Sequence, residues 1–510
     1  MANSSSSTAS SAFDSYQTSL TTRYCSPAMS KLFSQRSRHS TWRKLWLALA
    51  ESEKELGVDT ITDEALDQMR AHLTVTDDDF EVARIEEKSR RHVSQSLCHR
   101  FIHESAPSAS GHVHAFGAVA PAASGILHLG ATSCFVTDNT ELILVREAMD
   151  LIAKKIAKVI HNLSAFAVKW KAEPTLAYTH LQAAQLITVG KRAAQWVLDL
   201  MLDLHAIEQV SRELKFRGAQ GTTGTQASFL SIFEGDAAKC DRLNDLLCAK
   251  FGFPSCYEVS TQTYTRKVDL IIANAVAGLG STAQKITGDI RHLMHWKEIE
   301  EPFESSQIGS SAMAYKRNPM RSERVYSLAR ELMSKPASFA ATHSDQWAER
   351  TLDDSAIRRI DIPEMFLLAD AICIGLDNIS DGLVVYPGTC SPESVPWNLP
   401  FMITEEIIMR LCAKGVSRQE AHEQIRVLSH EAGAVVKQEG KPNPLVDKIR
   451  ANDFFKPIWG ELDGMLKAEL YTGRSSQIVD KYCGPGGAVE KALAPYEEYI
   501  KSSATAKLNV

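Results

Sequence analysis

Residues 138–163 read DNTELILVREAMDLIAKKIAKVIHNL and predict one long amphipathic helix. The large apolar residues recur every three or four positions, which is the spacing of one face of an α-helix. They are Leu142, Val145, Met149, Ile152, Ile156, Ile160 and Leu163. Asp138 and Glu141 stand at the N-cap and N3 positions of a capping box, so we expect the helix to start at Asp138 and to end before Pro174.

Four further segments carry helical spacing at comparable length. They cover about 184–214, about 262–299, the residues after Pro319, and about 363–383, where Pro363 suits a first turn. Several exceed roughly 25 residues, far longer than an average helix. Such lengths indicate antiparallel neighbours that bury long stripes against each other in a bundle. Few segments alternate with period two, so we predict an all-α fold rather than helices around a sheet.

The 510 residues are too many for one hydrophobic core. Composition changes near residue 133 and again after Tyr386-Pro387, and no internal repeat is evident. We therefore expect four parts. They are a disordered tail at 1–20, an N-terminal helical domain at 21–132, a central five-helix bundle at 133–386 and a C-terminal helical domain at 387–510.

Bulk properties argue against several classes of partner. The net charge is −6 and no basic stripe stands out, so neither nucleic acid nor a membrane surface is an expected partner. No apolar run reaches about 18 residues, as a membrane-spanning helix requires. The ten cysteines are scattered and form no C-x-x-C pair, which favours reduced thiols and a cytoplasmic location. His99 and His103 lack a nearby third ligand, so we expect no metal site.

One loop concentrates groups suited to chemistry. Residues 309–320 read GSSAMAYKRNPM, with Ser310, Lys316 and Asn318 placed just before a predicted helix start at Pro319. Backbone N–H groups at a helix start, together with a nearby ammonium group, suit an anionic ligand. The hydroxyl of Ser310 beside this cation is a candidate base, whereas the simpler alternative is a solvated serine-rich loop.

Other polar loops fall at the expected ends of the long helices, where segments distant in sequence meet. They are Gly130–Ser133, Thr179–Gln182, Gly221–Gln226, Thr261–Thr263 and Arg350–Ser355 with Arg358 and Arg359. His180 is either a general acid or base or a structural histidine. The stretch Gly221–Gln226 is a weak match to a phosphate loop, because no lysine follows it.

Arg350, Ser355 and Arg359 together have the composition of a phosphate clamp. The alternative is an arginine–aspartate surface network with Asp353 and Asp354. The charge pattern alone does not choose between the two.

Three segments together resemble one family. YKRNPMRSE at 315–323, RTLDDS at 350–355 and PTLAYTH at 174–180 resemble the eukaryotic type of adenylosuccinate lyase, in the aspartase/fumarase superfamily, and the likeness runs from about Thr22 to the last helices. It implies a three-domain fold and a homotetramer with a 20-helix core, in which three subunits share each active site. It implies no cofactor and no metal.

The activity implied by the resemblance is that of a C–N lyase. Such an enzyme eliminates fumarate from succinylated purine nucleotides: from adenylosuccinate to give AMP, and from SAICAR to give AICAR.

The resemblance also implies roles for individual residues. Ser310 matches the general base, His180 the general acid, and Glu323 the carboxylate that orients this histidine. The residues that match contacts to the succinyl group are Lys316, Asn318, Thr132, Ser133, Thr179 and Gln262. Those that match nucleotide and phosphate contacts are Arg23, Tyr24, Arg324, Arg350, Ser355 and Arg359. Arg91 and His92 match a further corner of the substrate site.

The chain departs from the family pattern at two places. Ala314 stands where the family has proline, and residues 93–107 are inserted between His92 and His112, so that no aspartate follows His92. Two alternatives to an active enzyme of this family follow. One is a catalytically impaired helical scaffold; the other is another fumarate-releasing lyase, such as argininosuccinate lyase. The Arg350–Arg359 clamp and the Tyr-Lys-Arg-Asn motif argue against the second.

Overall fold

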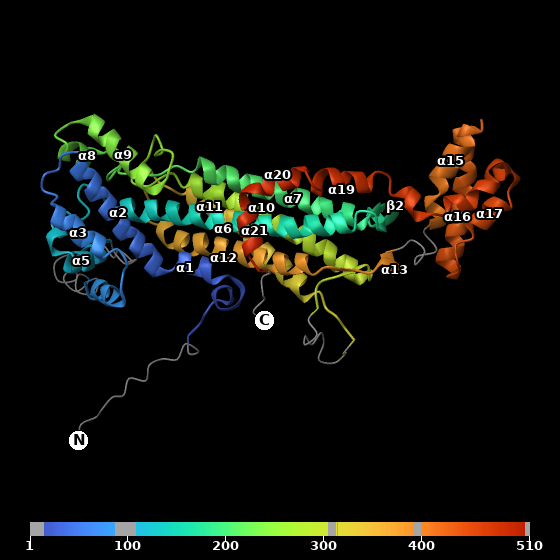
Figure 1. The fold of residues 1–510 in the computed structure, drawn as a ribbon, viewed down its shortest axis with the longest axis horizontal. Coiled ribbons are helices and arrows are strands. Elements are labelled where there is room, and N and C mark those ends of the chain that lie inside the picture. The colour runs from blue at the N-terminus through green and yellow to red at the C-terminus, as the bar shows by residue number, and fades with distance from the viewer. Residues whose placement is uncertain (1–14, 87–108, 304–312, 314, 391–398, 505–510) are drawn as a thin grey trace, which may run out of the picture.

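A computed structural model describes residues 15–86, 109–303, 313, 315–390 and 399–504. The molecule is elongated, and long helices run along its main axis (Figure 1). The helices of this bundle are α6 (Ser133–Lys169), α7 (Val189–Glu213), α10 (Lys267–His295), α11 (Met320–Ser344) and α12 (Asp354–Asp381). The predicted all-α fold with a central long-helix bundle is confirmed. No helix in the described ranges is both long and apolar enough to cross a membrane.

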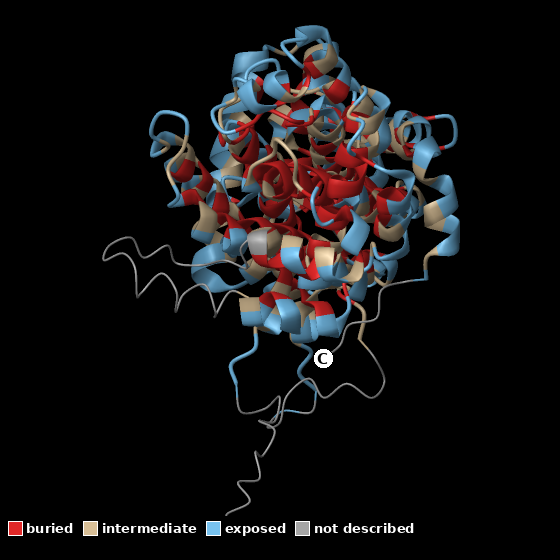
Figure 2. Cartoon of the chain, turned by 90° about the vertical axis from the view of Figure 1, so that its left-hand side faces the viewer, coloured by how far each residue is buried: buried red, intermediate tan, exposed pale blue. Residues whose placement is uncertain are grey.

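The predicted apolar stripe of α6 forms the middle of the core. Ile152, Ile156 and Ile160 are no more than 1% exposed. Burying one such side chain is worth about 1.5–3 kcal/mol, which explains why the stripe determines how the helix packs. Figure 2 views the molecule along the bundle and shows the buried residues gathered between the helices.

Two predicted helix starts were wrong. The helix α6 begins at Ser133 rather than Asp138, because the carboxylate of Asp138 is buried and binds Arg266 instead of capping the helix. The helix α12 begins at Asp354, so Pro363 lies inside it rather than in its first turn.

The predicted start of the second long helix, at about residue 184, was also wrong, because residues 184–188 belong to a β-hairpin. The antiparallel strands β1 (Pro174–Thr179) and β2 (Gln182–Thr188) precede α7, and the hydroxyl of Thr188 caps that helix by accepting the Lys191 N–H at 3.1 Å. A second short pair joins β3 (Ile299–Glu300) to β4 (Val384–Val385). Both pairs lie at the same end of the bundle, since Thr175 of β1 donates a hydrogen bond to Glu298, next to β3.

The remaining elements cover the two ends and one side of the bundle. Those that precede α6 in the chain are a π-helical turn η2 (Leu20–Tyr24), α1 (Pro27–Leu32), α2 (Gln35–Glu55), α3 (Asp63–Ala71), α5 (Ala109–Val119) and η3 (Pro121–Ala123). Between α7 and α10 lie α8 (Ala227–Ile232) and α9 (Ala237–Phe251). The carboxyl-terminal elements are α13 (Pro387–Cys390), α14 (Leu399–Met402), α15 (Thr404–Ala413), α16 (Arg418–Glu439), α17 (Leu445–Arg450), η5 (Asp453–Glu461), α18 (Leu462–Met465), η6 (Ala468–Tyr471), α19 (Ser475–Cys483), α20 (Ala488–Leu493), η7 (Ala494–Tyr496) and α21 (Glu497–Ser502).

The carboxyl-terminal residues divide between two places. Buried residues from Ile403 to Met465 form a core of their own around α15–α17, which projects beyond the hairpin end (Figure 1). The last helices, α19–α21, instead lie against α6 and α7. We propose the boundaries near residues 133 and 386 as domain limits, and residues 475–502 then form an arm that returns to the central bundle.

Two stacked histidines make stability depend on pH. His39 of α2 and His112 of α5 are buried with their ring centroids 3.9 Å apart. Burial, with the neighbouring His112, Arg38 and Arg359, lowers the pKa of His39 to about 3, and burial with Arg43 lowers that of His112 to about 4. Between pH 6.5 and about 4 the unfolded chain therefore binds more protons than the folded one. The contribution of the two histidines to the free energy of unfolding is complete above pH 6.5 and is lost as the pH falls below that value.

We expect the free energy of unfolding to drop by about 2 kcal/mol for each of these histidines between pH 7.5 and pH 5. Urea unfolding of wild type and His112→Phe at both pH values checks this, because the variant should lose less stability than wild type. Comparing the two proteins separates the effect of the histidine from that of Glu53. Burial raises the pKa of Glu53 to about 8, so this group makes stability fall as the pH rises, opposite to the effect of the histidines. Equal pH slopes in the two proteins would contradict the expectation.

Candidate active site

The start of α6 gathers several of the predicted substrate residues. Thr132 is the N-cap of α6, and Ser133 is the first residue of the helix. Gln262, in the loop before α10, accepts a hydrogen bond from the Nη1 of Arg350 at 2.9 Å. Burial raises the pKa of Cys134, and the positive charge of Arg350 is among those that oppose the rise, so Arg350 lies close to this helix start.

Polar atoms at this end are buried without a partner among the residues that the structure describes. They are the Oγ1 of Thr132, the Nε of Arg350 and the Oγ1 of Thr351. An N-cap threonine normally uses its hydroxyl to accept a backbone N–H of the first turn, and Thr132 does not. Buried polar groups are nearly always hydrogen-bonded in native proteins, so unpaired ones in a cluster indicate a site for a polar ligand. The N-terminus of α6 favours an anionic one.

Arg359 and Ser355 lie in the first turns of α12, at the same end of the bundle. Arg38 of α2 pairs with Glu141 of α6, and both influence Arg359. Partial burial and the adjacent Arg38 lower the pKa of Arg359, and two cations so close to each other suit an anion between them.

A buried ionic network holds these helix starts in place. Asp138 of α6 accepts hydrogen bonds from the Arg266 guanidinium, and the Nε of Arg266 donates to Asp354 of α12 at 2.7 Å. Arg358 of α12 donates from Nε to Asp269 of α10, also at 2.7 Å. Burial opposes ionisation of Asp138, but the arginines outweigh it and hold the pKa of this carboxyl below its usual range. The alternative of a surface network does not hold for Asp354, which is buried and binds Arg266.

We expect Asp138→Ala to lower the free energy of unfolding by about 3–5 kcal/mol, because it leaves the buried Arg266 with too little negative charge around it. Chemical denaturation at pH 7 measures the loss. Asp353→Ala is the matched control: Asp353 is exposed and its side chain makes no cap hydrogen bond. Similar stabilities for the two variants would contradict a structural role for the network.

The opposite end of the bundle carries the predicted general acid. Thr179 and Gln182 pair across the hairpin, and His180 and Leu181 form its two-residue turn. Both turn residues have positive φ, 53° and 59°, and both are exposed. The left-handed region costs a non-glycine residue about 1–2 kcal/mol, and strained backbone of this kind is concentrated at functional sites.

Part of the predicted catalytic loop lies at this same end. Ser310 and Ala314 fall outside the described residues, as do Arg91, His92, His99 and His103. Lys316 and Glu323 are exposed, and the Asn318 carbonyl accepts the Met320 N–H at 2.8 Å where α11 begins. The carboxylate of Glu301 fixes that helix start by accepting the N–H groups of Arg321 and Ser322, both at 2.9 Å.

Glu323 is expected to orient His180, but within one chain the two side chains make no hydrogen bond among the described contacts. Thr132 is the N-cap at the start of α6, whereas His180 lies in the hairpin that follows the end of this helix, and the hairpin, labelled β2, lies at the opposite end of the bundle from α2 and α3 (Figure 1). The 37 residues of this helix span about 55 Å at 1.5 Å per residue. No nucleotide bridges that distance, so these two residues of one chain do not meet on one ligand.

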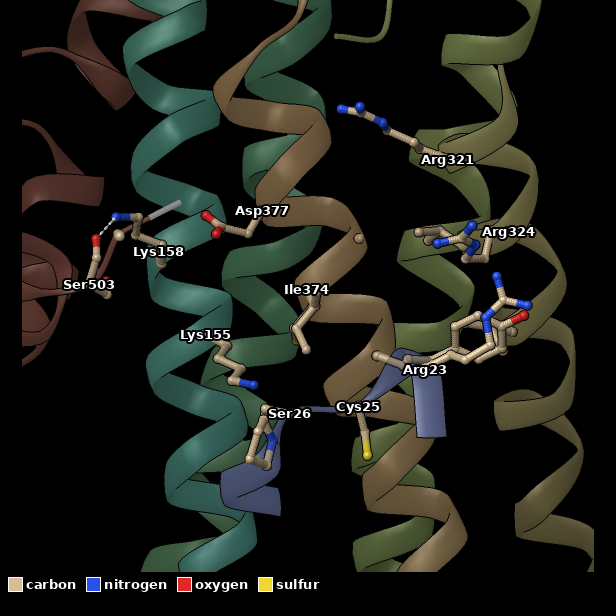
Figure 3. Close-up of a pocket in the computed structure, with 18 of the residues that line it drawn as sticks. Arg23, Cys25, Ser26, Lys155, Lys158, Arg321, Arg324, Ile374, Asp377 and Ser503 are labelled. Carbon is tan, nitrogen blue, oxygen red and sulfur yellow. Dashed lines mark hydrogen bonds between the residues drawn. The ribbon is translucent and has the colours of Figure 1, made fainter. Parts of the chain in front are cut away.

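A third group lies midway along the bundle. Arg23, Tyr24 and Arg324, all predicted nucleotide contacts, come together beside a cavity of about 260 Å³ (Figure 3). The guanidinium carbons of Arg324 and Arg23 lie 5.3 and 5.9 Å from the centre of the Tyr24 ring. Neither arginine pairs with a carboxylate in the described part of the chain. An aromatic ring beside two cations suits a flat, negatively charged ligand.

Sequence reasoning missed the residue that anchors this group. Asp370 of α12 is fully buried, accepts the Ser26 N–H at 2.6 Å, and pairs with Lys155 of α6. Ser26 follows Tyr24 closely, and η2, which carries Arg23 and Tyr24, has no buried residue of its own. The available signal was a single aspartate within the apolar stretch FLLADAIC at 366–373.

Comparison with known proteins places the chain in a family. A family model described as Lyase matches residues 22–334, and one described as Adenylosuccinate lyase C-terminus matches residues 400–482. The adenylosuccinate lyase of Saccharomyces cerevisiae is 50% identical over 98% of this chain and 99% of its own. That of Schizosaccharomyces pombe is 49% identical over 96% and 98%. The chain belongs to the adenylosuccinate lyase family.

More distant solved structures share the fold of this adenylosuccinate lyase family member. A 3-carboxy-cis,cis-muconate lactonizing enzyme from Pseudomonas putida superposes with a TM-score of 0.75 at 20% identity, covering 94% of this chain and 98% of its own. A fumarate lyase from Mesorhizobium sp. BNC1 gives 0.74 at 22% identity, covering 91% and 99%. Among the described residues, no group of three or more His, Cys, Asp or Glu side chains has an arrangement that would hold a metal ion.

Proposed function

We propose that this protein is a C–N lyase that eliminates fumarate from adenylosuccinate, leaving AMP, and from SAICAR, leaving AICAR. Membership of the adenylosuccinate lyase family carries the proposal. The three polar groups of the fold support it, since each offers what a part of such a substrate needs. The free N-terminus of α6 suits a succinyl carboxylate, and the arginines suit a phosphate or a purine.

The chemistry assigns a task to each residue. Ser310 removes the β-proton of the succinyl group, and His180 protonates the departing nitrogen. The intermediate carries more negative charge than the substrate, so Lys316 and nearby N–H groups accelerate the reaction by binding this charge. One such donor is typically worth about 10²–10³ in rate. Thr132, Ser133, Thr179, Gln262 and Asn318 would hold the succinyl carboxylates.

We further propose that the active unit is a homotetramer in which several chains build each site. The separation of Thr132 from His180 within one chain supports this, because a second chain can supply the missing end. Apolar side chains also remain exposed on the bundle, namely Leu198 and Leu202 of α7 and Ile271 of α10, at 39%, 62% and 47%. Cysteine usage in the sequence supports a cytoplasmic location.

Purified protein supplied with adenylosuccinate tests the function. We expect AMP and fumarate in equal amounts, and AICAR with fumarate from SAICAR. The alternatives differ in outcome. A scaffold whose Arg-His-Asp corner is lost, because no aspartate follows His92, releases neither product, and an argininosuccinate lyase consumes argininosuccinate instead.

Asp370 offers a test of the Arg23–Tyr24–Arg324 group. We expect Asp370→Asn to raise KM about tenfold, with a smaller change in kcat, because losing one charge-assisted hydrogen bond releases η2 and its two ligand contacts. Steady-state kinetics well below the unfolding temperature measure both constants. Asp361→Asn is the control, since Asp361 is buried on the same helix but pairs with Lys335. A KM that stays at the wild-type value in Asp370→Asn would contradict this role.

A further inference from the structure

Two cysteines near the start of the bundle lie unusually close together. Cys248 is in the last turn of α9, and Cys256 is in the extended segment that follows; their sulfur atoms are 3.4 Å apart. A disulfide needs about 2.05 Å, so the sulfur atoms must approach by only about 1.4 Å. All nine cysteines in the described ranges carry free thiols, and among them only this pair has its sulfur atoms in contact.

The backbone explains why these two thiols meet. The helix α9 ends at Gly252 with a φ of +68°, and the Phe253 N–H then bonds back to the Cys248 carbonyl at 3.0 Å. Cys256 is held from the other side by its bridge with Phe216. Both cysteines are therefore held at the ends of a tight turn, and oxidation requires only a small local shift that brings the two sulfur atoms together.

The pair also has a built-in nucleophile. The Cys256 thiol donates a hydrogen bond that lowers the pKa of Cys248, against the effects of burial and of Asp245. That same hydrogen bond, together with burial, raises the pKa of Cys256. Cys248 is thus the first of the two to ionise, and thiolates are the reactive form.

We propose that a peroxide oxidises Cys248 and Cys256 to a reversible disulfide with each other. We further propose that this bond changes the position of Gln262. The Cys248 thiolate attacks one peroxide oxygen, the O–O bond breaks, and a sulfenic acid and hydroxide form. The Cys256 sulfur then attacks the Cys248 sulfur, the S–O bond breaks, and the second oxygen leaves as water. Two thiols and one hydrogen peroxide yield one disulfide and two waters.

The link to Gln262 runs through close contacts. A Cβ built on Gly218 would lie 2.5 Å from the Cys256 sulfur, so this sulfur rests against the Gly218 backbone. Further along the same loop, a Cβ on Gly224 would lie 2.0 Å from the Ser260 carbonyl oxygen, two residues before Gln262. A shift of the Cys256 sulfur therefore acts on the loop from Gly218 to Gly224, and this loop contacts the segment that leads into Gln262. This part of the inference rests on the proposed function.

Peptide mapping of the full-length protein tests the disulfide. After treatment with hydrogen peroxide and alkylation, trypsin releases residues 243–250 and 251–266, each with one of the two cysteines. We expect these peptides to appear cross-linked, and dithiothreitol to separate them. Cys240→Ser, on the same helix, should keep the cross-link, whereas Cys248→Ser and Cys256→Ser should abolish it. Irreversible oxidation of Cys248 without a cross-link, or linkage to other cysteines instead, would overturn the proposal.

Kinetics test the link to the site. Peroxide should reduce fumarate release at low substrate about fivefold, the lower range of usual coupling between two sites, in wild type and Cys240→Ser. Dithiothreitol should restore it, and Cys256→Ser should not respond. A cross-link that leaves the kinetics unchanged would remove the link to Gln262. If the protein released no fumarate under any condition, the proposed function would fail, while peptide mapping would still decide the disulfide.

Discussion

His180→Ala should lower kcat by at least about 100-fold while substrate still binds, which is the usual contribution of a general acid. The nitrogen that leaves on C–N cleavage needs a proton as the bond breaks, and no other histidine lies in the hairpin turn. Binding should be largely retained, because the candidate carboxylate and phosphate contacts come from other segments. Ser310→Ala should lower kcat by a similar factor, through loss of the base.

Single-turnover kinetics separate this chemical step from binding and from product release. His295→Ala is the matched control, because His295 is an exposed histidine on α10 with no assigned role. The assignment of His180 fails if His180→Ala turns over at the rate of the control. It also fails if only KM rises.

Mixing two inactive variants should restore activity. His180→Ala removes a group at the hairpin end, and Arg350→Ala removes one at the Thr132 end, about 55 Å away along α6. If a site takes its hairpin from one chain and its Arg350 from another, random association of equal amounts leaves about a quarter of the sites with both groups intact. We expect mixed assemblies to approach that fraction of wild-type activity.

The doubly substituted chain provides the control. His180→Ala/Arg350→Ala, assembled alone, has no intact site and should stay inactive. Mass spectrometry of the intact assemblies establishes that the chains have exchanged. Inactive mixtures whose chains have demonstrably exchanged would mean that each site draws both groups from one chain, and the proposed sharing would be wrong.

The long helices were predictable because the apolar stripe of α6 repeats over so many turns that one helical face is unmistakable. The start of α6 was not predictable. Asp138 has the local pattern of an N-cap, but its partner Arg266 lies 128 residues further along the chain and binds it in the core. The hairpin was missed for a related reason. Its strand β2 reads QAAQLIT, which alternates only in part between polar and apolar residues and merges into the helical pattern of α7.

Site residues were predictable by type but not by place. Polar loops such as Thr179–Gln182 and Arg350–Ser355 were singled out because they interrupt apolar helices. Their positions at two ends of a long bundle follow from helix length and direction, which become clear only once the fold is known. Asp370 escaped notice because its function depends on the backbone of a distant segment rather than on any pattern around it.

The left-handed turn at His180 and Leu181 has a consequence for engineering. Glycine adopts such a conformation without steric cost, so a screen for heat resistance alone would favour glycine at either position. Glycine at 180 would gain thermal tolerance and remove the imidazole that the proposed reaction needs. At this one turn, selection for robustness and selection for catalysis would drive the sequence in opposite directions.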